Sequence, residues 1–397
     1  SVAKHDPKNP DWEGRDRIVW SAGHKAPALY TALAMSGYYP IEETAYLRKL
    51  NSRFQGHPHR LELKGVEVST GSLGQGFGIG VGMALAAKLN RKRHKVFVIT
   101  GDGEWDEGSM WESAMEAAHY RLDNLIVLID RNYLQIDGNT ETIMKLDPLE
   151  KKLQAFGWQV FPADGHNMAK ILAVLEKAKK VKDKPIAIIF KTIKGKGVSF
   201  MENVTGWHGK APNDEELIKA LKELKLEKKI DVQKFKALAL EYQKKMTLMV
   251  EKQVPKFKRN YWWNGQEKMK AEMVPTRFGF GQTLAKHGGD ERVVCLGLDI
   301  SESVQISKFY EGFVDRKSRW LSMGIAEQSA TTVAGGLAKE GKLPVISTYG
   351  VFCSQRNADQ MRTSICYGNL NVLFAGAHGG ISVGPDGATH QSLEEIS

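Results

Sequence analysis

Two short apolar runs, each followed by small and polar residues, constrain the fold of this chain most strongly. The first, Val96–Thr100, leads into Gly101-Asp102-Gly103, and the second, Leu125–Asp130, is followed closely by Asn132. Both runs are rich in β-branched residues, as strands buried on both faces of a parallel sheet are. Helix-forming residues from Glu112 to Tyr120 lie between them. The pattern therefore predicts a strand–helix–strand unit with parallel strands.

The polar residues after these two runs are suited to binding a metal ion. The carboxyl ends of neighbouring parallel strands meet at one edge of a sheet, where open α/β sheets bind ligands. At that edge Asp102 and Asn132 would offer a carboxylate and a carboxamide oxygen. Mg²⁺ takes oxygen ligands in octahedral geometry and usually completes its shell with water and phosphate oxygens. We therefore predict a metal site that holds a diphosphate.

The size and composition of the chain are those of a globular protein. It has 397 residues, 42% of them hydrophobic, which is enough for two or three cores. Three cysteines (Cys295, Cys353 and Cys366) are too few and too clustered for a disulfide framework, which favours a reducing cytoplasm. No apolar run approaches the roughly 20 residues that cross a bilayer, and the start lacks the apolar core of a signal peptide. We expect a cytoplasmic protein without a membrane partner.

The net charge of +10 raises the question of nucleic-acid binding. Much of the excess lies between Glu215 and Lys270, where lysines alternate with glutamates and leucines as on solvated helix faces. No nucleic-acid motif accompanies this stretch, so no nucleic-acid partner is expected. A modest positive field also attracts anionic substrates such as sugar phosphates.

The chain divides into two expected α/β domains. We expect residues 1–225 to form the first, residues 226–272 a charged helical linker and residues 273–397 the second, with helical spacing from Leu217 to Met249. The alternation of strands with helical stretches predicts doubly wound parallel sheets in both domains. The second offers only three strands, so we expect it to be incomplete. The further expected strands are Gln159–Phe161, Ile186–Phe190, Val293–Leu298, Pro344–Ser347 and Asn371–Ala375.

Three other features suit a binding site, and each also has an ordinary structural explanation. The glycine-rich turn Gly71–Gly78 either brings backbone close to an anion at a helix N-terminus or allows tight helix–sheet packing. Glu327 begins an Ala/Gly-rich helix, where the helix dipole favours any carboxylate. Five histidines in loops suit a polyhydroxylated anionic substrate and proton transfer rather than zinc. They are His24, His57, His208, His378 and His390.

Taken in order, these and other motifs closely resemble those of the transketolase family over essentially the whole chain. Transketolases are thiamine-diphosphate enzymes that transfer two-carbon ketol units between sugar phosphates. One such motif is weak evidence, whereas seven in the family's order are specific. The motifs are Arg15–Arg17 with Ser21–His24, Gly65–Gly76, Gly101–Gly103, Lys194–Gly197, Trp207–Gly209, Gly324–Gln328 and Gly384–Gln391.

The resemblance implies a role for each matching position. Asp102, the Asn132 side chain and the Leu134 carbonyl would bind the metal, Mg²⁺ or Ca²⁺, that bridges the diphosphate. Glu107 and Glu112 resemble acidic residues that couple cofactor sites across a dimer. The positions implied to bind thiamine diphosphate are His24, Leu73, Gly101, Glu107, Glu112, Asn132, His208, Asp299, Glu327, Tyr349 and Phe352. Those implied to bind the sugar phosphate are His57, Arg277, Ser303, His378, Asp386 and His390.

The resemblance also implies the chemistry and the assembly. The cofactor's thiazolium carbon must lose a proton to become a nucleophilic carbanion, and Glu327 would favour the imino tautomer that removes this proton. His24, His57, His208 and His390 would be the other catalytic groups, moving protons while the ketol unit passes from a ketose phosphate, such as xylulose 5-phosphate, to an aldose phosphate. Family members are homodimers in which the first domain of one subunit and the second domain of the other enclose each cofactor.

Against the family pattern, the chain as given is expected to lack the N-terminal start, the end of the pyrimidine-binding domain and a C-terminal domain. Two other functions remain as alternatives. One is a 1-deoxy-xylulose-5-phosphate synthase-like enzyme, which shares the cofactor but condenses pyruvate with glyceraldehyde phosphate. The run Gly56-His57-Pro58 and the loops of His208, His378 and His390 favour transketolase over it. The other is an inactive fragment that acts as a binding module.

Overall fold

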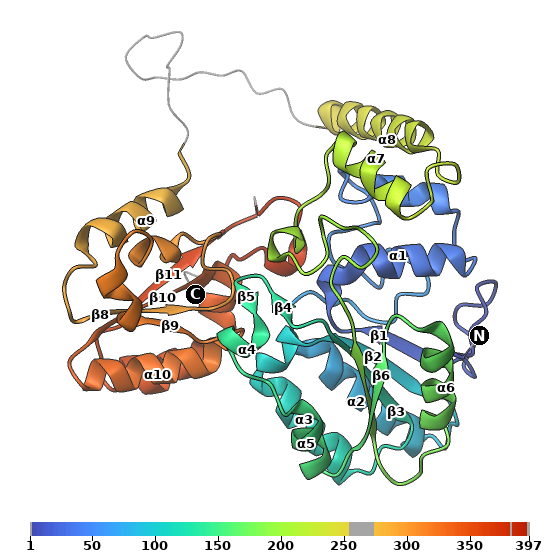
Figure 1. Ribbon diagram of the computed structural model, residues 1–397, viewed down its shortest axis with the longest axis horizontal. Coiled ribbons are helices and arrows are strands. Elements are labelled where there is room, and N and C mark those ends of the chain that lie inside the picture. The colour runs from blue at the N-terminus through green and yellow to red at the C-terminus, as the bar shows by residue number, and fades with distance from the viewer. Residues whose placement is uncertain (1, 254–273, 382, 395–397) are drawn as a thin grey trace.

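The computed structural model describes residues 2–253, 274–381 and 383–394 and contains two α/β domains, each built on a parallel sheet (Figure 1). The first sheet has the order β1-β2-β3-β7-β6 and the second the order β11-β10-β8-β9. The strands of the first are β1 (Arg17–Trp20), β2 (Val96–Gly101), β3 (Leu125–Arg131), β6 (Gln159–Asp164) and β7 (Ile186–Lys191). Those of the second are β8 (Val293–Gly297), β9 (Trp320–Ser322), β10 (Leu343–Tyr349) and β11 (Leu373–Ala377).

Helices cover both faces of each sheet, as apolar runs without alternation require. In the first domain α2, α3 and α5 pack on one face and α6 on the other. In the second, α9 and α10 lie on opposite faces. The helices are α1 (Ala26–Met35), α2 (Gln75–Leu89), α3 (Gly108–His119), α4 (Thr140–Ile143), α5 (Leu149–Ala155), α6 (Met168–Ala178), α7 (Asp214–Glu223), α8 (Val232–Gln253), α9 (Thr276–His287), α10 (Glu327–Lys339) and α11 (Ala358–Gln360).

Every expected strand is present, so the predicted fold of two doubly wound parallel sheets is confirmed. Two short strands, β1 and β9, were not expected, and β9 gives the second sheet a fourth strand among the described residues. A small hairpin of β4 (Leu134–Gln135) and β5 (Gly138–Asn139) lies between the two domains (Figure 1). It follows β3 directly and therefore brings the strand end of the first domain to the second.

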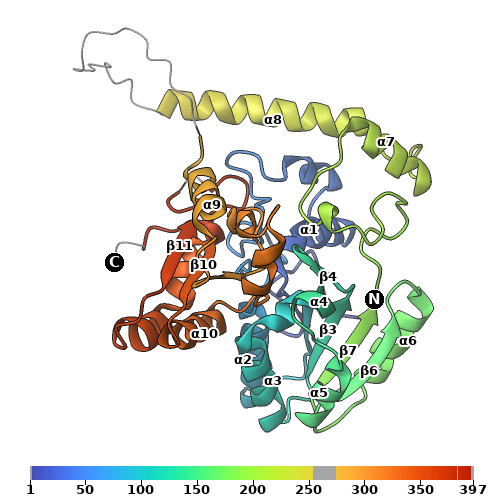
Figure 2. The same ribbon diagram turned by 60° about the vertical axis from the view of Figure 1, so that its left-hand side comes forward.

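The stretch with helical spacing from Leu217 to Met249 is two helices, α7 and α8, rather than one. The break includes Lys225, whose left-handed φ of 57° is incompatible with a continuing α-helix. Within the expected linker, α8 lies along the first domain (Figure 2). The rings of Tyr46 and Tyr242 stack at this contact with centroids 4.3 Å apart. Lys234 forms an ion pair of 2.9 Å with Glu42 at the same contact. The remainder of the expected linker, residues 254–272, lies outside the described residues.

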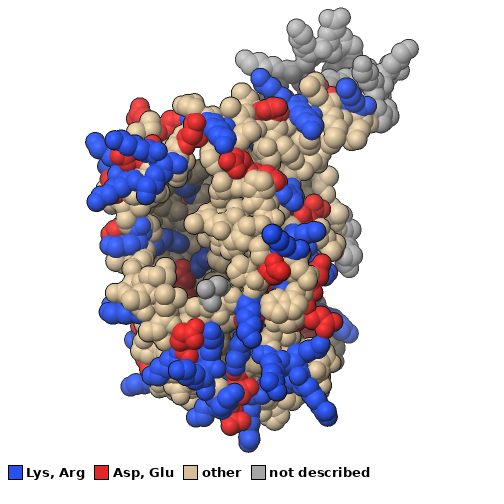
Figure 3. Space-filling model, turned by 90° about the vertical axis from the view of Figure 1, so that its right-hand side faces the viewer, with Lys and Arg blue, Asp and Glu red and all other residues tan. Residues whose placement is uncertain are grey.

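The surface is charged but mixed. On the side of the first domain that Figure 3 shows, Lys and Arg side chains surround a hollow and are interspersed with Asp and Glu. This distribution fits solvated helix faces, as the alternation of lysine with glutamate in the sequence indicates. Within the described residues, no helix has both the length and the apolar character that crossing a bilayer requires.

Close approach between α2 and the sheet depends on glycine. A Cβ added at Gly80 would meet Val98 Cγ2 of β2 well inside contact distance, and Val98 is fully buried. Gly82, two positions along the same helix, is exposed and faces open space within 4 Å. Substitution at Gly80 therefore tests packing against β2, whereas substitution at Gly82 tests helix propensity alone.

We expect Gly80→Ala to destabilise the protein by roughly 1–3 kcal/mol, because the new methyl overpacks a core that does not yield easily. Gly82→Ala should stabilise it by about 0.5–1 kcal/mol, because alanine loses less backbone entropy in a helix. Urea unfolding followed by circular dichroism measures both free energies. Equal effects at the two positions would show that α2 does not lie on β2 as described.

Candidate active site

A cavity of about 380 Å³ lies between the two domains, at the carboxyl ends of strands from both sheets. This is the edge at which the sequence predicted a ligand. Fourteen of the predicted site residues line it, which brings together positions up to 366 residues apart, from His24 to His390. They are His24, His57, Leu73, Gly101, Asp102, Asn132, Leu134, His208, Asp299, Glu327, Tyr349, Phe352, Asp386 and His390.

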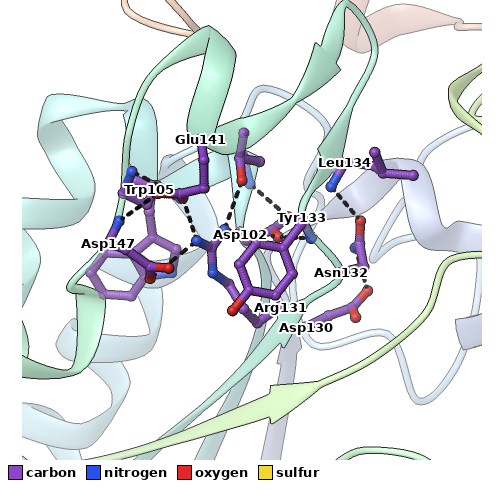
Figure 4. Close-up of polar contacts among 12 residues, drawn as sticks. Asp102, Trp105, Asp130, Arg131, Asn132, Tyr133, Leu134, Glu141 and Asp147 are labelled. Carbon is purple, nitrogen blue, oxygen red and sulfur yellow. Dashed lines mark hydrogen bonds and ion pairs between the residues drawn. The ribbon is translucent and has the colours of Figure 1, made fainter. Parts of the chain in front are cut away.

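The expected metal ligands lie side by side because β2 and β3 pair in parallel, with Gly101 opposite Asp130 (Figure 4). Asp102 Oδ1 accepts a hydrogen bond of 2.9 Å from the Gly103 backbone N–H. Asp102 Oδ2 accepts one of 2.6 Å from the Tyr133 N–H. These bonds fix the direction of the carboxylate where its strand ends.

The second ligand is held in the same way, since Asn132 Oδ1 accepts a hydrogen bond of 3.0 Å from the Leu134 N–H. Asp102 Oδ1 and Asn132 Oδ1 each accept one of these bonds and keep lone-pair capacity for an ion. One carboxylate, one carboxamide and one carbonyl, all lining a single cavity, fit a hard cation such as Mg²⁺ or Ca²⁺. In the described part of the chain, no three or more His, Cys, Asp and Glu side chains group as a metal site; the expected set includes only one such side chain, Asp102.

Arg131, which was not predicted from the sequence, forms an ion pair with Asp102 (Figure 4). Its side chain is 2% exposed, and its guanidinium lies 3.3 Å from Asp102 Oδ2 and 3.1 Å from Asp147 Oδ1. It also pairs with Glu141 and donates a hydrogen bond of 2.8 Å to Thr140 Oγ1. The buried guanidinium of Arg131 therefore links Asp102, at the end of β2, to the segment that contains α4.

The neighbours of Asp102 act on its charge in opposite directions. Burial raises the pKa of the Asp102 carboxyl, whereas the Tyr133 N–H and the Arg131 guanidinium oppose that rise because they stabilise the anion. A divalent cation at this position would favour the ionised form further.

Arg131→Met should destabilise the protein by about 3 kcal/mol, because it leaves the buried Asp102 without its cation. We place the loss near the low end of the usual range since Glu141 and Asp147 are partly exposed. Arg93→Met, which removes an exposed side chain, should change stability by less than about 0.5 kcal/mol. Thermal and urea unfolding provide the comparison, and equal losses in the two variants would contradict the role of Arg131.

The glycine-rich turn meets the packing requirement that the sequence suggested, and it also reaches the cavity. Gly74 has a left-handed φ of 87° at the N-cap of α2, and a Cβ added at Gly76 would lie 2.6 Å from Ser21 Cα. These positions therefore need glycine for conformation and packing. Gly71 and Leu73 of the same turn line the cavity, where backbone can approach a ligand.

A buried carboxylate holds this turn in place. Glu104 is 2% exposed and accepts hydrogen bonds from Ser21 Oγ (2.6 Å), the Gly74 N–H (3.0 Å) and the Gly101 N–H (3.3 Å). It directly follows the Gly101-Asp102-Gly103 segment, and only that position could have marked it in the sequence.

Two lysines add positive charge to the cavity near the expected metal. Lys25 pairs with Asp130, and Lys194 lines the same wall. Burial lowers the pKa of Lys194, and the Lys25 ammonium lowers it further. Cations in this position suit an anionic diphosphate, because it would relieve their mutual repulsion. Lys194 belongs to a motif noted in the sequence, but its position at the cavity was not expected.

The cavity histidines form two stacked pairs. The rings of His24 and His208 have centroids 5.3 Å apart, and those of His57 and His390, which come from different domains, are 4.6 Å apart. Burial lowers the pKa of His208 to about 4. Burial and the neighbouring His57 lower that of His390 to about 4. Neutral imidazoles both donate and accept hydrogen bonds, which suits sugar hydroxyls and proton transfer.

The second domain contributes a carboxylate and two aromatic rings. Glu327 is the first residue of α10, as expected, and is 2% exposed. The rings of Tyr349 and Phe352 stack with centroids 6.1 Å apart on the same wall. Asp299 accepts backbone hydrogen bonds from Ile136 (3.2 Å) and Asp137 (3.0 Å) of the first domain, and burial raises its pKa to about 7.

Five predicted site residues do not line the cavity. Arg277 and His378 pair with each other at 2.7 Å beside Tyr349, whose hydroxyl lies 3.2 Å from Ser303 Oγ. Tyr349, which contacts His378 and Ser303, itself lines the cavity. Glu107 is buried and pairs with Arg356, whereas Glu112 is exposed on α3. The coupling of cofactor sites assigned to Glu107 and Glu112 stays a prediction.

A cavity between two parallel-sheet domains, with the expected metal ligands on one side and a buried glutamate on the other, indicates a cofactor site of the thiamine-diphosphate type. Residues 1–273 match the family model "Transketolase, thiamine diphosphate binding domain", and residues 272–397 match "Transketolase, pyrimidine binding domain". The chain belongs to the transketolase family.

The chain is similar to proteins of differing length. It is 46% identical to the 6-deoxy-6-sulfo-D-fructose transketolase subunit SqwG of Clostridium sp. (strain MSTE9), over 57% of this chain and 82% of that one. It is 34% identical to transketolase-like protein 2 of Mus musculus, over 99% of this chain and 60% of that one. The solved transketolase of Campylobacter jejuni matches with 28% identity and a TM-score of 0.56, over 99% of this chain and 66% of that one.

Proposed function

We propose that this chain provides the cofactor site of a transketolase, which reversibly transfers a two-carbon ketol unit from a ketose phosphate to an aldose phosphate. The observation that carries the proposal is the convergence of Asp102, Asn132 and Glu327 on one cavity between the two domains. The chain spans about 60% of the length of transketolase-like protein 2 of Mus musculus, so the activity is proposed for the protein to which the chain contributes.

The cofactor proposed is thiamine diphosphate with Mg²⁺ or Ca²⁺. When bound, it would supply the carbon nucleophile that amino-acid side chains lack. Asp102, Asn132 and the Leu134 carbonyl would hold the metal, with Lys25 and Lys194 beside the phosphates. Across the cavity, Glu327 would receive the polar edge of the pyrimidine ring, next to the aromatic wall of Tyr349 and Phe352.

Substrate binding is assigned to the histidine side of the cavity. His57 Nδ1 lies 2.9 Å from the Asp386 carbonyl, which orients its ring against His390. Neutral rings at these positions would bond sugar hydroxyls and pass protons to and from them. Arg48, which also lines the cavity, is the nearby cation for an anionic group on the sugar. Relatives are named for different sugars, 6-deoxy-6-sulfo-D-fructose and apulose 4-phosphate, so the donor sugar is left open.

Asp102→Ala should abolish Mg²⁺-dependent thiamine diphosphate binding, because it removes the only carboxylate of the proposed metal set. Asp123→Ala, which removes a carboxylate paired with Lys88 away from the cavity, should leave the affinity unchanged. Isothermal titration with and without Mg²⁺ measures both. Unchanged affinity in Asp102→Ala would contradict the proposed metal site.

Product assays separate the candidate reactions. Turnover of xylulose 5-phosphate with ribose 5-phosphate supports the proposal, as does turnover of 6-deoxy-6-sulfo-D-fructose or apulose 4-phosphate with an aldose phosphate. Product only from pyruvate with glyceraldehyde 3-phosphate would favour the synthase alternative. An absence of saturable cofactor binding in the unmodified chain would favour a binding module.

We also propose that two copies of the chain assemble and share their cofactor sites. The two faces of the cavity come from separate domains, and one chain presents both. Sharing would pair the first domain of one copy with the second domain of its partner. The two arrangements use the same residues but differ in which copy provides them.

Co-expression of Asp102→Ala and Glu327→Gln chains with different affinity tags distinguishes the two arrangements. In a mixed dimer with shared sites, one site carries both changes and the other carries neither, so purification through both tags should recover cofactor binding. If each chain forms its own site, every site carries one change and no site binds with the affinity of the unmodified protein. Titration of the doubly purified protein gives the answer, with singly tagged homodimers as the control.

A further inference from the structure

Arg356 is a buried cation at the cofactor cavity that the sequence interpretation did not include. It ends a π-helical turn, Phe352–Arg356, which follows β10 and lines the cavity. Its side chain is 11% exposed, and its guanidinium lies 4.5 Å from the centre of the Phe352 ring. Single π-helical turns are rare and often occur at functional sites, because the extra residue redirects side chains.

The guanidinium of Arg356 connects the two domains. Its Nη1 lies 2.8 Å from Glu327 Oε2 in the second domain and also pairs with Glu107 of the first. Its Nη2 donates to Ser72 Oγ in the glycine-rich turn. The Arg356 carbonyl accepts a hydrogen bond of 3.1 Å from Gln328, the residue after Glu327. Both the side chain and the backbone of Arg356 therefore contact the N-terminus of α10.

The charges at this point require a cation. Glu107 and Glu327 are 7% and 2% exposed, and one guanidinium nitrogen contacts both. Without that cation, two poorly solvated carboxylates would face each other, and either could turn away to reach water. Burial raises the pKa of Glu107 to about 9, with the neighbouring Glu327 adding to the rise and Arg356 opposing it.

We propose that Arg356 is a positioning residue for the cofactor: it directs the Glu327 carboxylate into the cavity by anchoring it to Glu107 and Ser72 across the domain boundary. This inference rests on the proposed function, in which Glu327 receives the pyrimidine ring. Arginine suits the task because its planar fork has several donors in fixed directions, so one side chain holds Glu327, Glu107 and Ser72 at once. Lysine would supply the charge from a single flexible point.

A double-mutant cycle on cofactor affinity tests the proposal. Arg356→Met should weaken Mg²⁺-dependent thiamine diphosphate binding about tenfold, a coupling in the range seen for contacting residues. In a Glu327→Gln background the same change should cost about twofold or less, because its target is no longer a carboxylate. Arg356→Lys should fall between Arg356→Met and the unmodified chain. Isothermal titration measures the dissociation constants, and circular dichroism and urea unfolding monitor the fold.

Arg15→Met is the matched control, since Arg15 forms a similar partly buried pair of 2.8 Å with Glu67 that does not line the cavity. It should leave cofactor affinity unchanged. If Arg356→Met does not fold, Arg356→Lys replaces it in the cycle, with the same requirement that its effect disappear in Glu327→Gln.

The other possible results contradict either the positioning role of Arg356 or the proposed function. Equal losses in both backgrounds would mean that Arg356 acts by general stability rather than through Glu327. Tighter binding by Arg356→Met would mean that the arginine blocks Glu327 instead of directing it. Both results refute the positioning role and leave the proposed function intact. No saturable binding by the unmodified chain refutes the proposed function and this inference together.

Discussion

The geometry of the cavity depends first on the buried carboxylate of Glu104. Its three hydrogen-bond donors come from the end of β1, the glycine-rich turn and the end of β2, so one side chain fixes three loops at once. An unsatisfied buried carboxylate costs several kcal/mol, so these loops cannot move independently. Asp102 lies next to Gly101, one of the three anchored positions. Glu104 is not one of the proposed metal ligands, but it holds the end of β2 that carries Asp102 in place because it must keep its three donors.

The same burial sets the charges around the cavity. It raises the pKa of Asp299 to about 7 and lowers those of His208 and His390 to about 4, because a poorly solvated site disfavours charge of either sign. A diphosphate with a divalent cation would bring its own charges and change these values. Phosphate oxygens beside a histidine favour the imidazolium, so cofactor binding and histidine protonation are coupled by linkage.

The sequence predicted most of the strands because parallel strands buried on both faces are continuous apolar runs, as Val96–Gly101 and Leu125–Arg131 are. It missed β1 and β9, which are short and include Arg17 and Ser322. Motifs located fourteen cavity residues, because ligand chemistry restricts those positions directly. Arg131, Glu104 and Arg356 were not found, because each acts through a partner distant in sequence and only the folded chain shows which carboxylate or donor it meets.

The residues that line the cavity also lie at the contact between the two domains. Asp299 accepts backbone hydrogen bonds from Ile136 and Asp137, which follow β4. A Cβ added at Gly71 would lie 2.7 Å from Thr389 Oγ1 of the second domain. Such close contacts must form between a first and a second domain whether one copy or two provide them. A ligand that binds both faces stabilises the closed arrangement in proportion to its concentration relative to its dissociation constant. The cofactor would therefore act as part of the domain contact as well as the reactive group.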